Sequence, residues 1–119
     1  MMESFEAKLN KDNHINSLYD FYGSLLTKKQ ADYISQYYAD DFSLGEISEN
    51  FGVSRQAVYD NIRRTEKTLE NYEKKMNLYK HFVNRNEIID ELSEYINENY
   101  ANDQKLSEIV KRLEKVEEE

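Results

Sequence analysis

Cysteine, proline and tryptophan are absent from this 119-residue chain, and glycine occurs only three times. Without cysteine there are no disulfides, no cysteine-based zinc sites and no thiol catalysis. Few helix breakers and 34% charged residues favour long helices over a sheet. No apolar run approaches the roughly 20 residues that span a bilayer, and the N-terminus lacks the apolar segment of a signal peptide. We therefore expect an all-α, cytoplasmic protein without membrane insertion.

Motifs that would identify an enzyme are also missing. The chain contains neither GxxxxGK[ST] nor GxGxxG, so it has no recognisable cradle for nucleotide phosphates. Its two histidines, His14 and His81, are far apart and do not form a metal-binding pair. We expect His14 and His81 to be surface residues or partners of helix ends. The prediction is a non-enzyme that needs no metal and no cofactor.

A pattern of two short helices joined by a tight turn, FSLGEISENFGVSRQAVYDNIRR, extends from Phe42 to Arg64. Gly52 stands where the first helix must stop, because glycine adopts a positive φ without steric cost. Apolar residues recur at helical spacing around it: Leu44, Ile47 and Phe51 before, Val53, Val58 and Ile62 after. The small Ser48 lets the two helices cross closely. The pattern predicts a helix-turn-helix at residues 43–64, whose second helix would enter the DNA major groove.

Signals for helix starts support these boundaries. Ser43 and Glu46 form an S-x-x-E capping box before the first helix, and Ser54 is placed to cap the second. Upstream, Thr27 and Gln30 form a further box at the start of a helix expected over residues 28–40. Each such cap contributes about 1 kcal/mol to helix stability, so three caps fix the helix starts well.

The second helix of the pair is expected to continue far beyond the motif. A heptad pattern of apolar residues follows it: Val58, Ile62, Thr65, Leu69, Tyr72, Met76 and Tyr79. A helix over residues 55–80 would be about 40 Å long. We expect a helix over residues 15–26 before the motif and two more after it, with Asn102 or Asp103 capping the last. The predicted domains are 1–80, which contains the motif and the long helix, and 81–119, a C-terminal helical arm.

The rear half of the long helix has no obvious cover within one chain unless the C-terminal arm folds back over it. Two readings stay open, a homodimer and an intramolecular hairpin. The homodimer is favoured, and its predicted interface comprises Leu69, Tyr72, Met76, Tyr79 and Phe82.

Charge is unevenly distributed along the chain, whose net charge is −8. Residues 54–85 carry eight Lys or Arg against four Asp or Glu, whereas the segments on both sides are acidic. The cations therefore gather on the second helix of the motif and its extension. Two interpretations are open: a strip that contacts phosphate, and an ordinary solvated helix face.

Two resemblances rest on these residues. The segment LGEISENFGVSRQAVYDNI, from Leu44 to Ile62, resembles the helix-turn-helix of sigma factor region four. The longer stretch from Leu18 to Met76 resembles the YlxM family of small bacterial helix-turn-helix proteins, through LTKKQ, a tyrosine-rich second helix and the EKTL extension. The family resemblance implies a regulatory protein that binds double-stranded DNA and is linked by gene neighbourhood to the signal recognition particle pathway.

The sigma resemblance also implies which residues would contact DNA. It places these on the exposed face of the recognition helix: Ser54, Arg55, Gln56, Tyr59, Asp60 and Arg63. Arg suits guanine and Gln suits adenine, so Arg55 and Gln56 are the candidates for base contacts. Further cations would meet phosphates: Arg63, Arg64, Lys67, Lys28 and Lys29.

Tyr59 and Asp60 depart from the sigma pattern, because basic or amide residues are usual at these two positions and a carboxylate repels phosphate. This departure keeps an alternative open, an adaptor that binds protein or RNA components of the signal recognition particle pathway. Tyrosines on the second helix, Tyr33, Tyr37 and Tyr38, could stack on RNA bases, although such rings more often belong to a core.

Overall fold

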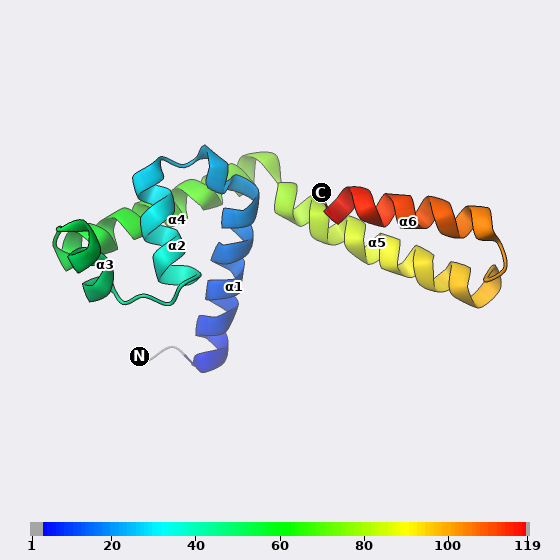
Figure 1. The fold of residues 1–119 in the computed structure, drawn as a ribbon, viewed down its shortest axis with the longest axis horizontal. Helices are drawn as coiled ribbons and strands as arrows, with labels where there is room; N and C mark the ends of the chain where they lie inside the picture. Colours follow the sequence, from blue (N-terminus) through cyan, green and yellow to red (C-terminus); the bar gives the residue numbers. More distant parts are fainter. Residues whose placement is uncertain (1–3, 119) are drawn as a thin grey trace. The chain divides into compact units, whose positions relative to one another are not determined.

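The computed structural model describes residues 4–118, and within them the fold is all-α, as predicted, with no strand (Figure 1). The helices are α1 (Phe5–Tyr22), the 3-10 helix η1 (Gly23–Leu25), α2 (Lys28–Tyr38), α3 (Leu44–Phe51), α4 (Arg55–Met76), α5 (Leu78–Asn99) and α6 (Gln104–Glu118). None of these helices is long and apolar enough to cross a membrane. The predicted helix-turn-helix corresponds to α3 and α4.

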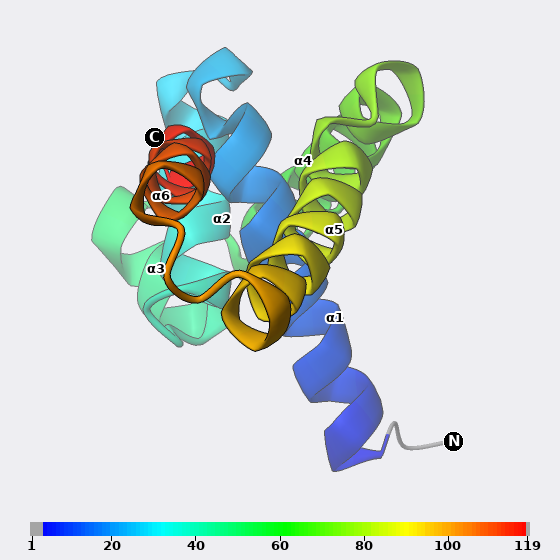
Figure 2. The ribbon, with the colours of Figure 1, turned by 90° about the vertical axis from the view of Figure 1, so that its right-hand side faces the viewer.

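The chain forms two compact units, one ending at Asn77 and the other beginning at Leu78. We call them the N-terminal unit, α1 to α4, and the C-terminal hairpin, α5 with α6. In the hairpin the two helices pack side by side and run in opposite directions, joined by a short connection (Figures 1 and 2). The division lies a few residues before the boundary expected after residue 80.

The long helix predicted over residues 55–80 is shorter in the structure, because α4 ends at Met76. Asn77 adopts the left-handed conformation, with φ 55° and ψ 29°, and its N–H donates to the Glu73 carbonyl. Asparagine tolerates this conformation better than most residues and can end a helix as glycine does. The apolar heptad pattern continues through this break, so periodicity alone could not reveal it.

The first helix begins earlier than predicted, at Phe5 instead of near residue 15. Its first turns are mostly polar and their apolar side chains, Phe5 and Leu9, are exposed, but Ser4 caps them by accepting a hydrogen bond from the Ala7 N–H at 3.1 Å. The helix gives way to η1 after Tyr22, so the predicted end at residue 26 is also corrected.

The core of the N-terminal unit forms where α1, α2 and α3 pack on α4. Its largest fully buried side chains are Tyr22, Tyr33, Leu18, Ile34, Ile47, Leu69, Val58 and Thr65. The Thr65 hydroxyl donates to the Asn61 carbonyl at 2.9 Å, so this buried polar group is satisfied. The core holds the outer face of α4 in a fixed position.

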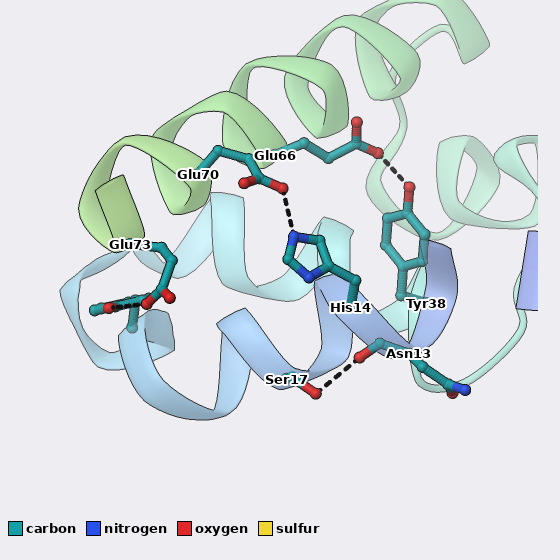
Figure 3. A network of polar contacts seen from close by, with 8 residues as sticks. Asn13, His14, Ser17, Tyr38, Glu66, Glu70 and Glu73 are labelled. Atoms are coloured by element: carbon teal, nitrogen blue, oxygen red, sulfur yellow. Dashed lines mark hydrogen bonds and ion pairs between the residues drawn. The ribbon is translucent and has the colours of Figure 1, made fainter. Parts of the chain in front are cut away.

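Three carboxylates on α4 tie the helix to α1 and α2 (Figure 3). Glu66, Glu70 and Glu73 are spaced by four and three residues, which places them on one side of the helix. Glu66 accepts a hydrogen bond from the Tyr38 hydroxyl of α2. On α1, His14 pairs with Glu70 at 2.8 Å and Tyr22 donates to Glu73 at 2.6 Å. Hydrogen bonds to ionised groups are stronger than neutral ones, so these contacts reinforce the apolar core.

Candidate nucleic-acid interface

The turn between α3 and α4 has the geometry that the sequence predicts. Gly52 is left-handed, with φ 65° and ψ 36°, and the Val53 N–H donates to the Ser48 carbonyl at 3.1 Å. No atom lies within 4 Å of the position that a Cβ on Gly52 would take. The backbone conformation, and not a lack of space, is therefore the reason for glycine here.

All three predicted helix caps are present. The Ser43 hydroxyl accepts from the Glu46 N–H at 3.1 Å, and the Glu46 carboxylate accepts from the Ser43 N–H at 3.2 Å. At the start of α4, Ser54 accepts from the Ala57 N–H at 3.0 Å. Thr27 and Gln30 form the same reciprocal pair before α2. These bonds fix where the two helices of the motif begin.

The inner faces of α3 and α4 are closely packed. Ile47 and Val58 are fully buried, and Ser48 lies between the helices with little exposure. The Phe51 ring meets the edge of Tyr33 on α2, with ring centroids 4.8 Å apart. Because one side of α4 is covered in this way, the other side of its first turns faces outward.

The residues predicted to contact DNA are all exposed. They are Ser54, Arg55, Gln56, Tyr59, Arg63, Arg64 and Lys67 on or next to α4, and Lys28 and Lys29 on α2. These side chains differ in the contacts that they already make within the chain.

Arg55 lies against α3. A Cβ built on Gly45 would meet the Arg55 guanidinium at 3.0 to 3.2 Å, so the guanidinium rests on the Gly45 backbone. Gly45 belongs to the first turn of α3, next to the Ser43 cap. The side chain of Arg55 therefore crosses from the start of the recognition helix to the start of the preceding helix.

The middle of the exposed face carries three intrahelical contacts. The Gln56 amide donates to the Asp60 carboxylate at 2.9 Å. One turn further on, the Arg63 guanidinium lies 5.9 Å from the Tyr59 ring centroid and 3.8 Å from the Glu66 carboxylate. Tyr59 and Asp60, the two departures from the sigma pattern, thus contact two of the side chains expected to touch DNA, Arg63 and Gln56.

The cations of α2 also differ from one another. Lys28 forms an ion pair with Asp32 at 2.9 Å, and this hydrogen bond together with the Asp32 charge raises the pKa of Lys28. Lys29 instead lies 5.8 Å from the centre of the Tyr33 ring, which itself touches Phe51 of α3. Of the two, Lys29 is the one linked to the helix-turn-helix. Arg64 and Lys67 have no ion-pair partner among residues 4–118.

Sequence reasoning missed two supporting residues, Gly45 and Glu66. Gly45 carries no turn signal, because it lies inside a helix where its role is to leave room for Arg55. Glu66 is a carboxylate in a charged stretch, yet it is buried and links Tyr38 to Arg63. Its spacing from Glu70 and Glu73 was the available signal, but the pairing partners come from distant parts of the chain.

The residues predicted for a dimer interface are divided between the two units. Leu69 is fully buried, and the Tyr72 ring packs near Tyr22 at 5.9 Å between centroids. Both therefore have cover within one chain, contrary to the premise of the prediction. Met76 is exposed at the end of α4, whereas Tyr79 and Phe82 belong to α5 and are half-buried. The interface predicted from the heptad pattern is therefore interrupted at Asn77, where α4 ends.

Comparisons with known proteins place this chain in a family. Residues 9–112 match the model of the family UPF0122, described as "Putative helix-turn-helix protein, YlxM / p13 like". A UPF0122 protein of Limosilactobacillus reuteri (strain DSM 20016) is 56% identical over 112 residues, which is 94% of this chain and 99% of the relative. A UPF0122 protein of Anoxybacillus flavithermus is 54% identical over 109 residues, covering 92% of this chain and 99% of the relative. No catalytic activity is known for this family.

Proposed function

Because the chain belongs to the UPF0122 family of YlxM- and p13-like helix-turn-helix proteins, we propose that it is a regulatory protein that binds double-stranded DNA. One observation carries the proposal. The turn at Gly52 and the caps at Ser43 and Ser54 fix α4 so that its polar first turns face outward beside α3. A helix presented in this way fits the major groove.

Base contacts would come from the first two turns of α4. Arg55 supplies a fork of N–H donors suited to the O6 and N7 acceptors of guanine. Gln56 already donates one N–H to Asp60, so the pair presents mainly oxygen acceptors to the groove. Acceptors match the exocyclic amines of cytosine and adenine. We infer that Asp60 contributes to base reading together with Gln56, instead of opposing DNA binding.

Phosphate contacts would come from the flanks of the same helix. Arg64 and Lys67 are exposed cations, and Lys29 lies at the start of α2 beside the motif. Arg63 is held by Tyr59 and partly neutralised by Glu66, so its phosphate contact would serve mainly to position α4 on the duplex. Lys28 would contribute least, because Asp32 already neutralises it.

Selection of duplexes from sheared genomic DNA by the purified protein tests the proposal. We expect a discrete set of promoter fragments to be enriched. Replacing Arg55 and Arg63 by Ala together should lower affinity for those fragments about 100-fold, since each good base or positioning contact is worth about 1–3 kcal/mol.

The matched control is Lys74→Ala/Lys75→Ala, which removes the same charge from the last turn of α4. Its affinity should stay within about threefold of the unchanged protein. No enrichment of any duplex, or equal losses in the two double variants, would contradict specific DNA binding by this face.

The acidic segments on both sides of the cationic strip support a second candidate, an adaptor that binds protein or RNA of the signal recognition particle pathway. Capture from the native cytoplasm separates the two functions. Recovery of signal-recognition-particle components alone, unchanged by Arg55→Ala/Arg63→Ala, favours the adaptor. Recovery of promoter fragments that this variant loses favours the regulator.

A further inference from the structure

The C-terminal hairpin buries only a small core of its own. Ile89 and Ile96 of α5 and Val110 of α6 are its buried apolar side chains. Arg85 and Glu117 form an ion pair at 3.0 Å that links the first half of α5 to the end of α6 and fixes their antiparallel register. Chains of about 40 residues rarely stay folded on such a core without a further partner.

A second set of apolar side chains in the hairpin is exposed. It consists of Ile88, Leu92 and Tyr95 on α5 and Ile109, Leu113 and Val116 on α6, with exposed fractions between 40% and 65%. Within each helix the spacings are three and four residues, so each set forms one stripe. The Tyr95 ring also lies near Tyr100, with centroids 6.1 Å apart, which extends the first stripe.

Both stripes lie on the same face of the hairpin. In each helix an exposed apolar residue directly precedes a buried one: Ile88 before Ile89, Tyr95 before Ile96, and Ile109 before Val110. One residue corresponds to a rotation of about 100°. Because the helices are antiparallel, the same rotation away from the shared core turns both stripes toward the same side.

The opposite face of the hairpin is polar. A groove there is lined by Ser93, Asn97, Ser107, Lys111 and Glu114, beside the buried Ile96 and Val110. The hairpin is therefore a two-helix layer with one polar side and one apolar side. Such a layer resembles half of a four-helix bundle.

We propose that a second copy of this chain packs on the apolar face, so that two hairpins form a four-helix bundle. Two helices about 10 Å wide and at least about 22 Å long offer a flat face of roughly 450 Å². This is just over half of the roughly 800 Å² per partner of standard complexes, and the charged borders of the face add to it. This interface differs from the dimer interface that the sequence predicted around Leu69, and it does not depend on DNA binding.

Charge along the borders of the face selects one arrangement of the two copies. By helical periodicity, Glu91 and Glu98 border the α5 stripe on its outer side, and Lys105 and Arg112 border the α6 stripe on its outer side. A two-fold axis parallel to the helices places each α5 on the α6 of the other copy, so acidic and basic borders meet. A perpendicular axis would place α5 on α5 and bring the acidic borders together. Like charges disfavour this second arrangement.

Sedimentation velocity of the full chain at micromolar concentration tests the dimer. We expect a mass near twice the 14.3 kDa of the chain. Ile88→Glu/Val116→Glu should reduce it to the single-chain mass, with helix content by circular dichroism unchanged because both side chains are about two-thirds exposed.

The matched control, Asn97→Glu/Gln104→Glu, adds the same two charges to the same helices away from the apolar face and should leave the dimer intact. A chain that stays monomeric at about 100 micromolar, a concentration at which a dimer with a micromolar dissociation constant would be mostly assembled, would overturn the proposal. A dimer that Ile88→Glu/Val116→Glu leaves intact would overturn it as well.

Charge reversal tests the arrangement. Glu91→Lys/Glu98→Lys should weaken the dimer at least tenfold, and adding Lys105→Glu/Arg112→Glu should restore it. If the first variant leaves dimerisation unchanged, or the fourfold variant fails to recover it, the α5-on-α6 arrangement is wrong.

Discussion

Glu66 is a nearly buried carboxylate in the middle of α4. Two groups offset the cost of burying its charge, the Tyr38 hydroxyl from α2 and the Arg63 guanidinium at 3.8 Å. Burial and the hydrogen bond to Glu66 raise the pKa of the Tyr38 phenol above its usual value. Tyr38 therefore keeps its proton in the folded chain and remains the donor that Glu66 requires.

At the residue scale, we predict that Tyr38→Phe destabilises the fold by about 2 kcal/mol at pH 7, because it leaves the Glu66 carboxylate without its donor. The stability that Tyr38 contributes is present below pH 10 and is lost above it, since the unfolded phenol ionises there while the folded one does not. Urea unfolding at pH 7 and pH 10.5 should show that the free energies of unfolding of Tyr38→Phe and the unchanged chain differ less at the higher pH.

Tyr37→Phe is the control for this change, because Tyr37 is half-buried and its ring packs on the same Tyr38 at 5.0 Å. Its effect should stay within about 0.5 kcal/mol. Equal stability of Tyr38→Phe and the unchanged chain at pH 7 would mean that Glu66 does not depend on this donor.

At the scale of elements, the sequence predicted those features that depend on neighbours in the chain. The caps at Ser43 and Ser54 and the turn at Gly52 are local, and each is present. The end of α4 was not predictable, because Asn77 has no unique signature and the apolar pattern crosses it. The contacts of Arg55 with Gly45 and of Tyr38 with Glu66 join separate helices, so no local pattern could predict them.

Gly52 provides the prediction at this scale. Gly52→Ala should destabilise the N-terminal unit by about 1–2 kcal/mol, the cost of a side chain in the left-handed conformation. Gly52→Asn should cost clearly less, since Asn77 already adopts the same conformation at the end of α4. Thermal unfolding of the unchanged chain, Gly52→Ala and Gly52→Asn measures their order of stability. If Ala is tolerated as well as Asn, the turn does not require a left-handed residue.

For DNA binding by the whole molecule, the distribution of charge along the chain matters more than the net charge. The net charge of −8 opposes contact with DNA over long distances, whereas the cations of residues 54–85 would act at the proposed contact itself. This combination allows only a small number of phosphate contacts. The acidic segments would keep DNA away from the rest of the surface and restrict it to the strip along α4.

The proposed strip predicts the salt dependence of DNA binding. About four phosphate contacts, from Arg63, Arg64, Lys67 and Lys29, give a slope of log affinity against log salt of about −3 to −5. Arg64→Ala/Lys67→Ala should make the slope shallower by about 2, while Lys74→Ala/Lys75→Ala should leave it unchanged. Fluorescence anisotropy on a selected duplex between about 50 and 200 mM salt, the range over which counterion release is measured, gives these slopes. A slope near −8 would require phosphate contacts outside this strip. A slope near zero would mean that the protein makes no contacts to the phosphates of the duplex.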